Sequence, residues 1–237
     1  MSGTLYGVGV GPGDPELLTV KAVRVIKEAD VIAVPGKVAE QSVAYQIVQG
    51  LYEQFGKLEE WKQKVFLPIE MPMIKDAFQL QKAHDLGAKQ IQKVLEEGKK
   101  IAFLTLGDPC IYSTYLYIHK RIGEMGYDTA IINGIPSFCA AAARMNIGLT
   151  EKAQPLHVYP ASYGMKEGLQ LSGTKVLMKT GKKMEQVKNE LIRQNAEAVM
   201  IENCGMADEK IYKTAEEIPD QSGYYSLIIV KEKGETI

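Results

Sequence analysis

The chain has 237 residues, and its 28 Lys plus Arg against 29 Asp plus Glu give a formal net charge of −1 at pH 7. This balance disfavours a duplex-nucleic-acid binder, which usually carries a basic excess. Three separated cysteines without a CxxC pair indicate reduced thiols rather than a disulfide framework or a zinc site. No signal-peptide pattern and no apolar run of membrane-spanning length is present, so we expect a cytoplasmic protein with no membrane partner.

The first half of the chain alternates short apolar runs with amphipathic stretches. Strands are predicted at Leu5–Val10, Val31–Val34, Lys64–Ile69, Ile101–Leu106 and Thr129–Ile132. Helices are predicted at Pro15–Ala29 with Asp14 as its N-cap, at Ser42–Phe55, at Lys75–Glu97, over Leu116–Met125, and after Pro136. This alternation predicts a parallel sheet with helices on both faces.

The pattern changes after Gly148 and predicts a second, smaller α/β domain with a mixed sheet. Strands are predicted at Leu156–Tyr159, Lys175–Met178, Ala198–Ile201 and Tyr225–Val230, and helices at Met165–Leu171 and Met184–Gln194. The short segment Lys210–Tyr212 is ambiguous. We expect an N-terminal domain over residues 1–134 and a C-terminal domain over residues 135–237.

The strand Ile101–Leu106 is almost wholly apolar and is followed at once by the turn formers Gly107, Asp108 and Pro109. In open α/β sheets, ligands bind beyond the carboxyl ends of the strands. This loop is therefore a candidate floor of a small-molecule site, although ordinary strand-to-helix turns look the same in sequence.

The glycine-rich segment after the first predicted strand does not fit a dinucleotide-binding fingerprint. Counting from Gly7, the last glycine position holds Pro12, and counting from Gly9 it holds Asp14. No GK[ST] of a phosphate-binding loop is present either. The N–H groups at the start of the next predicted helix, near Asp14–Leu17, have no helical partner. We expect them to be available to an anionic group such as a carboxylate.

Five segments resemble, in order, the motifs of the tetrapyrrole methylases of corrin and sirohaem synthesis. They are GVGVGPGDPELLTVKAVRVIKEADVIAVP (7–35), LTLGDPCIYST (104–114), IINGIPSF (131–138), VLMKTGKK (176–183) and ENCGMADEKIY (202–212). Within the family, the chain is most similar to the C20-methyltransferases that act on precorrin-2 or its cobalt form, cobalt-factor II. Because paralogues share these loops, another ring position stays open.

The resemblance implies S-adenosylmethionine held in a cleft between two α/β domains. The residues that match the family's cofactor motifs are Leu106, Gly107, Asp108, Ile111, Ser113, Thr114, Pro136, Ser137, Met178, Lys179, Cys204, Gly205 and Met206. Pro12, Gly13 and Asp14 would line the substrate side. Two departures from the family pattern are Pro136, which replaces a hydroxyl residue, and Asn133, which replaces a proline and should relax that turn. The family also implies a homodimer and an anionic tetrapyrrole substrate.

Methyl transfer from a sulfonium needs few side chains, because the methyl group is already activated and positioning supplies much of the rate. No metal and no catalytic residue is assigned. Candidates for a base are Asp14, His84, Tyr112 and Tyr212, each of which has an ordinary structural role as alternative. Arg24, Lys37, Lys179 and Lys182 are candidates to pair with substrate carboxylates. His119 and His157 lack the spacing of metal ligands.

Other branches of the resemblance remain open at this level. One branch methylates ribosomal RNA, which this nearly neutral chain does not favour. Another is similar to diphthine synthases, and a third possibility is a sensor that binds the donor without transferring its methyl group.

Overall fold

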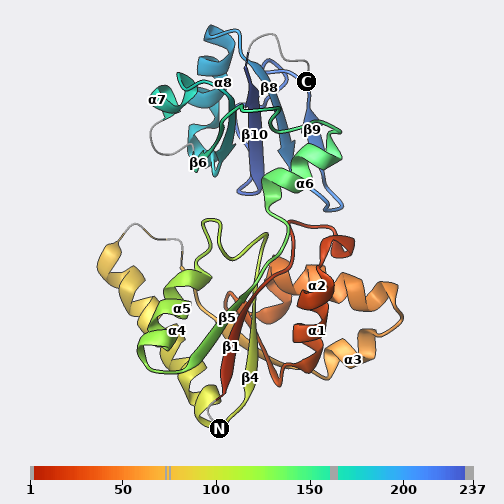
Figure 1. Cartoon of the computed structure of the whole chain (residues 1–237), viewed down its shortest axis with the longest axis vertical. Coiled ribbons are helices and arrows are strands. Elements are labelled where there is room, and N and C mark those ends of the chain that lie inside the picture. Colours follow the sequence, from red (N-terminus) through yellow and green to blue (C-terminus); the bar gives the residue numbers. More distant parts are fainter. Residues whose placement is uncertain (1–2, 73, 75, 161–164, 233–237) are drawn as a thin grey trace. The chain divides into compact units, whose positions relative to one another are not determined.

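The structure is a computed structural model that describes residues 3–72, 74, 76–160 and 165–232. Contacts divide the chain into two compact units, Met1–Pro136 and Ser137–Ile237, two residues beyond the expected boundary. Figure 1 shows that each unit is a sheet covered by helices. The predicted α/β class is confirmed, with one parallel and one mixed sheet.

The first unit contains a five-stranded parallel sheet in the order β3-β2-β4-β1-β5. Its strands are β1 (Thr4–Gly9), β2 (Val31–Pro35), β3 (Val65–Ile69), β4 (Lys100–Thr105) and β5 (Asp128–Ile132). Its α-helices are α1 (Val20–Glu28), α2 (Val43–Gln54), α3 (Leu58–Lys62), α4 (Ala77–Glu96) and α5 (Tyr115–Glu124). Short 3₁₀ turns lie at η1 (Pro15–Leu17) and η2 (Ala39–Gln41).

Both faces of this sheet are buried, which explains its nearly continuous apolar strands. Successive β4 residues alternate between two cores: Ala102 and Leu104 pack on the side of α1, α2 and α3, whereas Ile101 and Phe103 pack on the side of α4 and α5. The two helical layers stand on opposite sides of the strands in Figure 1. The strands are thereby fixed, and only their ends and loops are free to build a site.

The predicted helix Pro15–Ala29 is wrong in its first turn. The structure divides it into η1 and α1, because Leu18 and Thr19 adopt extended backbone angles between the two. Asp14 caps η1 as expected, and Thr19 starts α1 afresh by accepting a hydrogen bond from the Ala22 N–H through its side chain. Sequence reasoning favoured Asp14-Pro15 as the only start and overlooked Thr19.

Helix α3 is absent from the sequence prediction. It has only five residues, follows a glycine turn, and is mostly charged on its surface. The helix buries Trp61, whose side chain is inaccessible to solvent. The Trp61 ring packs against Tyr45, Tyr52 and Phe66 at centroid distances of 4.8–5.3 Å. One tryptophan in a charged segment gives no periodic signal.

The second unit contains a mixed sheet in the order β6-β7-β10-β8-β9. Its strands are β6 (Leu156–Pro160), β7 (Thr174–Met178), β8 (Glu197–Glu202), β9 (Lys210–Tyr212) and β10 (Ser226–Lys231). Among the described strands of this sheet, only β6 and β7 pair in parallel; β10 runs antiparallel to both of its neighbours, and β8 runs antiparallel to β9. The α-helices are α6 (Ser137–Arg144), α7 (Met165–Leu169) and α8 (Met184–Arg193), with a 3₁₀ turn η3 at Gly181–Lys183. The ambiguous segment Lys210–Tyr212 is thus a strand.

The predicted start of the long helix at Lys75 falls outside the described residues. The structure begins α4 at Ala77 with Asp76 as its N-cap.

Within the described ranges, no helix is long and apolar enough to cross a membrane.

Helices α4 and α5 are joined by a buried histidine. The His84 ring is 3 % exposed and stacks on Tyr117 with centroids 4.5 Å apart, while Asp85 and Arg121 form an ion pair of 2.7 Å beside it. Burial lowers the pKa of His84 because it disfavours the charged ring, and the Arg121 charge lowers the pKa further. The helix pair therefore depends on a neutral imidazole.

We predict that the free energy of unfolding falls as the pH drops below about 6.5, where an unfolded histidine takes up its proton. The sign follows from the lowered pKa of His84 in the folded state. The contribution of the neutral imidazole to stability is complete above about pH 6.5, the pKa of an unfolded histidine, and is lost as the pH falls through the folded-state pKa. His84→Phe keeps the stack and should flatten the pH dependence measured by urea unfolding. Burial also lowers the pKa of His119, so part of the slope should remain. An unchanged slope in the variant would contradict this account.

Candidate functional site

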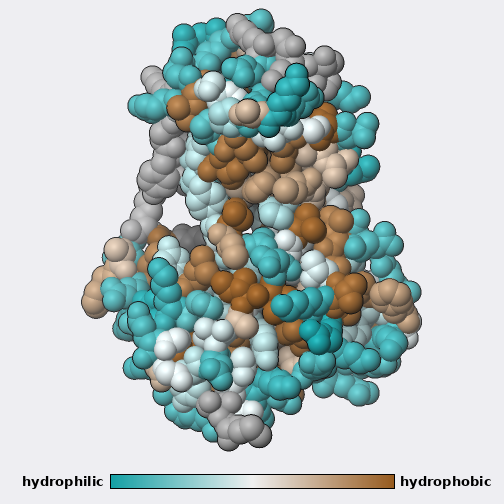
Figure 2. Space-filling model, viewed as in Figure 1, coloured by the Kyte–Doolittle hydropathy of each residue, from teal (hydrophilic) through white to brown (hydrophobic). Residues whose placement is uncertain are grey.

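The candidate site is built on the sheet edge of the first unit where the parallel strands end. Because β4, β1 and β5 are neighbours, the loops that follow them, residues 10–14, 106–114 and 133–136, leave the same edge. The chain leaves β1 toward β2 but leaves β4 toward β5, so the crossovers run in opposite directions. Such a switch point is where open α/β sheets bind ligands. Figure 2 shows hydrophobic surface over this end of the first unit.

Main-chain contacts hold the three loops together. The Gly107 N–H donates to the Gly11 carbonyl at 2.8 Å, and the Gly11 N–H donates to the Gly107 carbonyl at 3.3 Å. The loop after β5 lies equally close: a Cβ on Gly134 would stand 2.2 Å from the Gly107 oxygen and 2.7 Å from the carbonyl carbon of Gly9. Only glycine fits this position, because any side chain would separate the loops.

Asp108 ties the loop after β4 to the loop after β5. Its side chain is buried, with the residue 6 % exposed. Oδ1 accepts the Cys110 N–H at 2.7 Å, whereas Oδ2 accepts the Gly134 N–H at 3.0 Å and the Asn133 Nδ2 at 3.1 Å. Three acceptor positions of this carboxylate are therefore used inside the unit, out of about four. Its part in a site is to hold the loops.

Two hydrogen bonds hold the turn at Asn133, where we expect a relaxed turn in place of the family's proline. Its side chain donates to Asp108, and its carbonyl accepts a hydrogen bond of 3.3 Å from the Thr19 Oγ1. The side-chain amide therefore makes a bond to the neighbouring loop that a proline cannot make, whereas the bond from the start of α1 uses the main-chain carbonyl, which a proline also has. The replacement of the family's proline could not reveal these bonds in sequence, because the partners Asp108 and Thr19 are far away in the chain.

The remaining predicted residues of the loop after β4 lead into α5. Ser113 Oγ lies 2.8 Å from Thr105 Oγ1 and accepts the Tyr115 N–H at 3.2 Å, so it fixes the start of the helix. Thr114 is exposed at the N-cap position, and Ile111 is half-buried. Cys110 is exposed, but burial of its thiol and the adjacent Asp108 raise the thiol's pKa. Its thiol is not an activated nucleophile.

The loop after β1 differs from the expectation of an anion site. Pro15 has no N–H, the Glu16 N–H donates to Asp14 Oδ1 at 2.9 Å, and the Leu17 N–H donates to the Asp14 carbonyl at 3.1 Å. The N–H groups that we expected to be available are bonded within the turn. Pro12 and Gly13 are buried and Asp14 is half-buried.

In the second unit, the predicted residues also share one sheet edge. Strands β7 and β8 end there and β10 begins there, since Leu227 pairs with Met178 and Ser226 with Glu202. Lys179 follows β7 with a positive φ of 56°, and the buried Thr180 Oγ1 lies 2.9 Å from Ser226 Oγ. These contacts shape the loop after β7.

The loop after β8 carries Cys204, Gly205 and Met206. It begins at Asn203, whose φ is 54° and whose carbonyl accepts the Met206 N–H at 2.9 Å. The Gly205 N–H donates to Glu209 Oε2 at 2.8 Å, and the other oxygen of Glu209 accepts from Arg144 Nε at 2.7 Å. The loop is therefore tied to the end of α6. Pro136 and Ser137 lie where the first unit ends and α6 begins.

The structure separates the four candidate bases. His84 is buried against Tyr117 in the helix pair, and Tyr212 packs on the core of the second unit from β9. Asp14 caps η1. Tyr112 is 44 % exposed on the loop after β4, with a φ of 50°. Asp14 and Tyr112 are thus on the loop edge of the first unit, whereas His84 is not presented to it.

The candidate basic residues are also dispersed. Arg24 lines a cavity of about 280 Å³ together with Lys100, the first residue of β4. Arg24 therefore lies near the amino ends of the strands, opposite the edge that carries the candidate site. Lys37 follows β2 and forms an ion pair of 3.2 Å with Glu70. Lys179 is in the second unit, and the Lys182 side chain lies outside the described residues.

The histidines His119 and His157 have other partners. His119 Nδ1 is 3.1 Å from the Tyr115 hydroxyl, and His157 Nε2 is 3.0 Å from the Ser172 carbonyl. In the part of the chain that the structure describes, no three His, Cys, Asp or Glu side chains are grouped to hold a metal ion.

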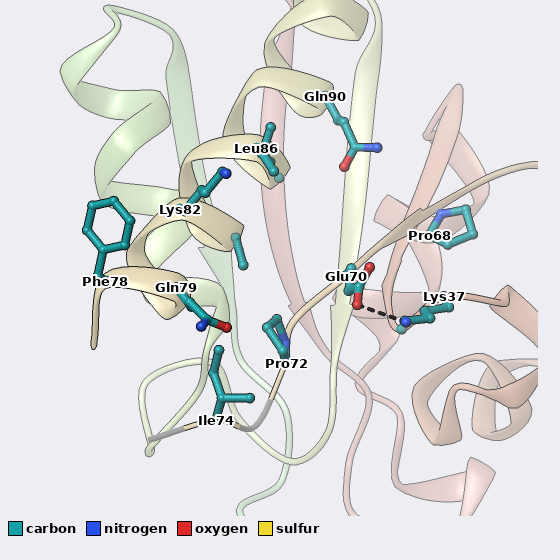
Figure 3. A pocket seen from close by; sticks show the side chains of 13 residues that line it. Lys37, Pro68, Glu70, Pro72, Ile74, Phe78, Gln79, Lys82, Leu86 and Gln90 are labelled. Atoms are coloured by element: carbon teal, nitrogen blue, oxygen red, sulfur yellow. Dashed lines mark ion pairs between the residues drawn. The ribbon is translucent and has the colours of Figure 1, made fainter. Parts of the chain in front are cut away.

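Sequence reasoning missed a groove on the first unit between α4 and the ends of β2 and β3. Its volume is about 1010 Å³, and Figure 3 shows Lys82 and Leu86 on the helical wall opposite Lys37 and Glu70. The signal was present as the stripe Phe78, Lys82, Leu86 and Gln90 at four-residue spacing. In sequence, this stripe alone does not indicate a groove, because the opposite wall comes from the ends of β2 and β3.

Comparison with known proteins decides the family. The family model for tetrapyrrole (corrin/porphyrin) methylases matches residues 4–219. The chain belongs to this family. A Methanocaldococcus jannaschii protein named "Probable cobalt-precorrin-2 C(20)-methyltransferase" is 36 % identical over 234 residues, covering 96 % of this chain and 95 % of the relative. The precorrin-2 C(20)-methyltransferase of a Sinorhizobium species is 30 % identical, with the same coverages of 96 % and 95 %.

A solved structure supports the fold of this family member. It is the uroporphyrin-III C-methyl transferase of Thermus thermophilus, complexed with S-adenosylhomocysteine, which matches with a TM-score of 0.65 at 19 % identity. The match covers 97 % of each chain. The expected resemblance to tetrapyrrole methylases is confirmed.

We predict that Asp108→Asn destabilises the protein by about 1–3 kcal/mol, because the amide must present an N–H₂ group to at least one of the three donors around it. Urea unfolding at neutral pH measures the change. The matched control is Asp128→Asn, which alters an exposed carboxylate at the first residue of β5 and should stay within about 0.5 kcal/mol of the wild type. Equal effects of the two substitutions would show that Asp108 does not hold the loops.

Proposed function

We propose that this tetrapyrrole methylase transfers a methyl group from S-adenosylmethionine to C20 of precorrin-2 or of its cobalt form, cobalt-factor II, in cobalamin biosynthesis. The observation that carries the proposal is the similarity over nearly the full length, at 36 % and 30 % identity, to two proteins named as C20-methyltransferases of these substrates. The relative with bound S-adenosylhomocysteine, the demethylated form of the donor, supports the choice of donor.

The residues proposed to contact the donor follow from the family motifs and lie in loops of each unit, taken by itself. In the first unit these are Leu106, Gly107, Asp108, Ile111, Ser113, Thr114 and Pro136, and in the second Ser137, Met178, Lys179, Cys204, Gly205 and Met206. The loop chemistry fits such a donor. Gly134 allows the loops after β4 and β5 to pack closely, and the half-buried Ile111 offers apolar surface to an adenosyl group.

The donor supplies an activated methyl group that a nucleophilic ring carbon can take directly. The task of this chain is then to hold the two reacting atoms in line, and such positioning is worth effective molarities of about 10⁵–10⁸ M. The bonds of Asp108 suit this task because they fix the loops before the ligands arrive. Proton loss from the methylated carbon needs an acceptor, and Tyr112 is the one candidate base that stands exposed on the loop after β4.

The proposed substrate is an anionic tetrapyrrole that approaches the first unit from the side of Pro12, Gly13 and Asp14. These residues precede α1 and continue the same edge of the sheet as the loop after β4. Assembly as a homodimer, which the family resemblance implies, stays a prediction. A cytoplasmic location, which we expect from the sequence pattern, also stays a prediction.

We predict that the purified protein adds one methyl group to precorrin-2 or cobalt-factor II when S-adenosylmethionine is supplied under anaerobic conditions. Mass spectrometry measures the addition, and NMR of a product made with labelled methyl locates it at C20. Addition of the methyl group at another ring position would contradict the proposed C20 specificity and indicate the activity of a paralogous methyltransferase. Tight binding of S-adenosylhomocysteine without any transfer to either substrate would indicate a sensor.

A matched pair of variants connects this activity to the loop after β4. Ile111→Asp places a charge against the proposed adenosyl site and should reduce affinity for S-adenosylhomocysteine by at least about tenfold in calorimetry. Ile192→Asp makes the same change on α8, where the side chain is 39 % exposed, and should leave the affinity unchanged. Equal affinities in both variants would remove Ile111 from the donor site.

A further inference from the structure

The groove beside α4 has features of a ligand site that the donor loops do not explain. Three of the large apolar side chains that remain exposed, Ile74, Phe78 and Leu86, all line it, at 38 %, 78 % and 54 % exposure. Apolar surface gathered in one hollow indicates a binding surface more often than scattered exposure does. The volume of about 1010 Å³ is at the upper end of the range for small-molecule sites.

The helical wall of the groove is one stripe of α4. Phe78, Lys82 and Leu86 follow each other at four-residue spacing, so an ammonium group stands between two apolar side chains. The buried stripe of the same helix contains Ala88, Ile91 and Leu95 and packs on the sheet. The exposed stripe is therefore not needed to attach α4.

The opposite wall begins where β2 and β3 end. Lys37 and Glu70 stand there, 3.2 Å apart, with side chains that are 76 % and 58 % exposed. An exposed ion pair of this kind contributes at most about 1 kcal/mol, so Lys37 can exchange Glu70 for another carboxylate at little cost. Figure 3 shows this pair across the groove from Lys82.

The groove lies along the same sheet edge as the proposed methyl-transfer loops. Strand β2 pairs directly with β4, and β3 pairs with β2, so the ends of these strands lie one and two strand spacings from the loop after β4. Neighbouring strands are about 4.8 Å apart, which places the groove wall within roughly 10 Å of that loop along the edge. A wide ligand that reacts at the loop extends over this distance.

We propose that the groove holds the far rim of the tetrapyrrole substrate, with Lys82 and Lys37 pairing its peripheral carboxylates and Phe78 and Leu86 contacting its apolar face. The proposal rests on the proposed function, because it assigns a binding region for that same substrate. The choice of occupant follows from charge and shape: two ammonium groups and one carboxylate line a hollow whose remaining walls are largely apolar. Lys82 is a substrate-positioning residue here and takes no part in bond making.

The test is a charge series at Lys82 in the full-length protein, with the tetrapyrrole KM, kcat and S-adenosylhomocysteine affinity measured for each variant. Lys82→Gln should raise KM for the tetrapyrrole about tenfold, Lys82→Glu should raise it further, and Lys82→Arg should keep it near the wild-type value. The donor affinity and kcat should not change. Lys89→Gln removes a charge from the same helix outside the groove and serves as the control.

A binding measurement separates this inference from the proposed function. Uroporphyrin, a stable tetrapyrrole carrying eight carboxylates, should bind the wild type and Lys89→Gln alike, and Lys82→Gln more weakly, with a difference that shrinks as salt is added. If the wild type is active, and Lys82→Gln has the same KM and the same uroporphyrin affinity as the wild type, the inference is overturned while the proposed function stands. A change of sedimentation mass in Lys82→Gln with unchanged KM would make the groove an interface between copies, which also overturns it. Failure of every variant and the wild type to methylate a tetrapyrrole would overturn the proposed function itself.

Discussion

The carboxylate of Asp108 is the constraint on which the candidate site depends. Two strands that are not neighbours, β4 and β5, end in loops that the buried Asp108 side chain connects through two hydrogen bonds, while a third bond holds the side chain within its own loop. The strand between them, β1, is joined to the same loop by main-chain bonds between Gly11 and Gly107. Because these bonds exist before any ligand is present, the loops need not be ordered at the moment of binding, which reduces the entropic cost of holding a ligand.

This arrangement explains why so few charged side chains mark the site. A family that moves an activated methyl group needs placement more than it needs acid or base strength. Asp108 uses its charge internally, Ser113 fixes the start of α5, and Glu209 ties the loop after β8 to α6. Several of the polar side chains in the sequence motifs therefore hold the loops in place. The backbone and apolar groups of these loops form the surface of the candidate site.

The fold could be predicted from the sequence wherever apolar periodicity was strong. The five parallel strands and the long helix α4 have that signal, since each is buried on a definite face. The break at Leu18 and Thr19 could not be predicted because two N-caps, Asp14 and Thr19, stand five residues apart and only the first was considered. Helix α3 depends on the contacts of one residue, Trp61, and a single aromatic has no period.

The candidate site was predictable as a location but not as a set of roles. The turn formers after Leu106 identified the edge, yet the partner of Asp108 is 26 residues away at Gly134, a distance that local reasoning does not bridge. The stripe Phe78, Lys82 and Leu86 was visible in sequence, but it gains meaning only when the ends of β2 and β3 supply the opposite wall. Long-range pairing therefore decides both the roles in the loops and the existence of the groove.

Amide hydrogen exchange with and without S-adenosylhomocysteine tests the central claim, that preordered loops at the ends of β4 and β5 receive the methyl donor. The account predicts slow exchange at the Cys110 and Gly134 amides in the free protein, since both donate to Asp108, and added protection of segments 104–114 and 131–137 on binding. Fast exchange at these two amides before binding, or protection confined to segments outside both loops, would contradict it.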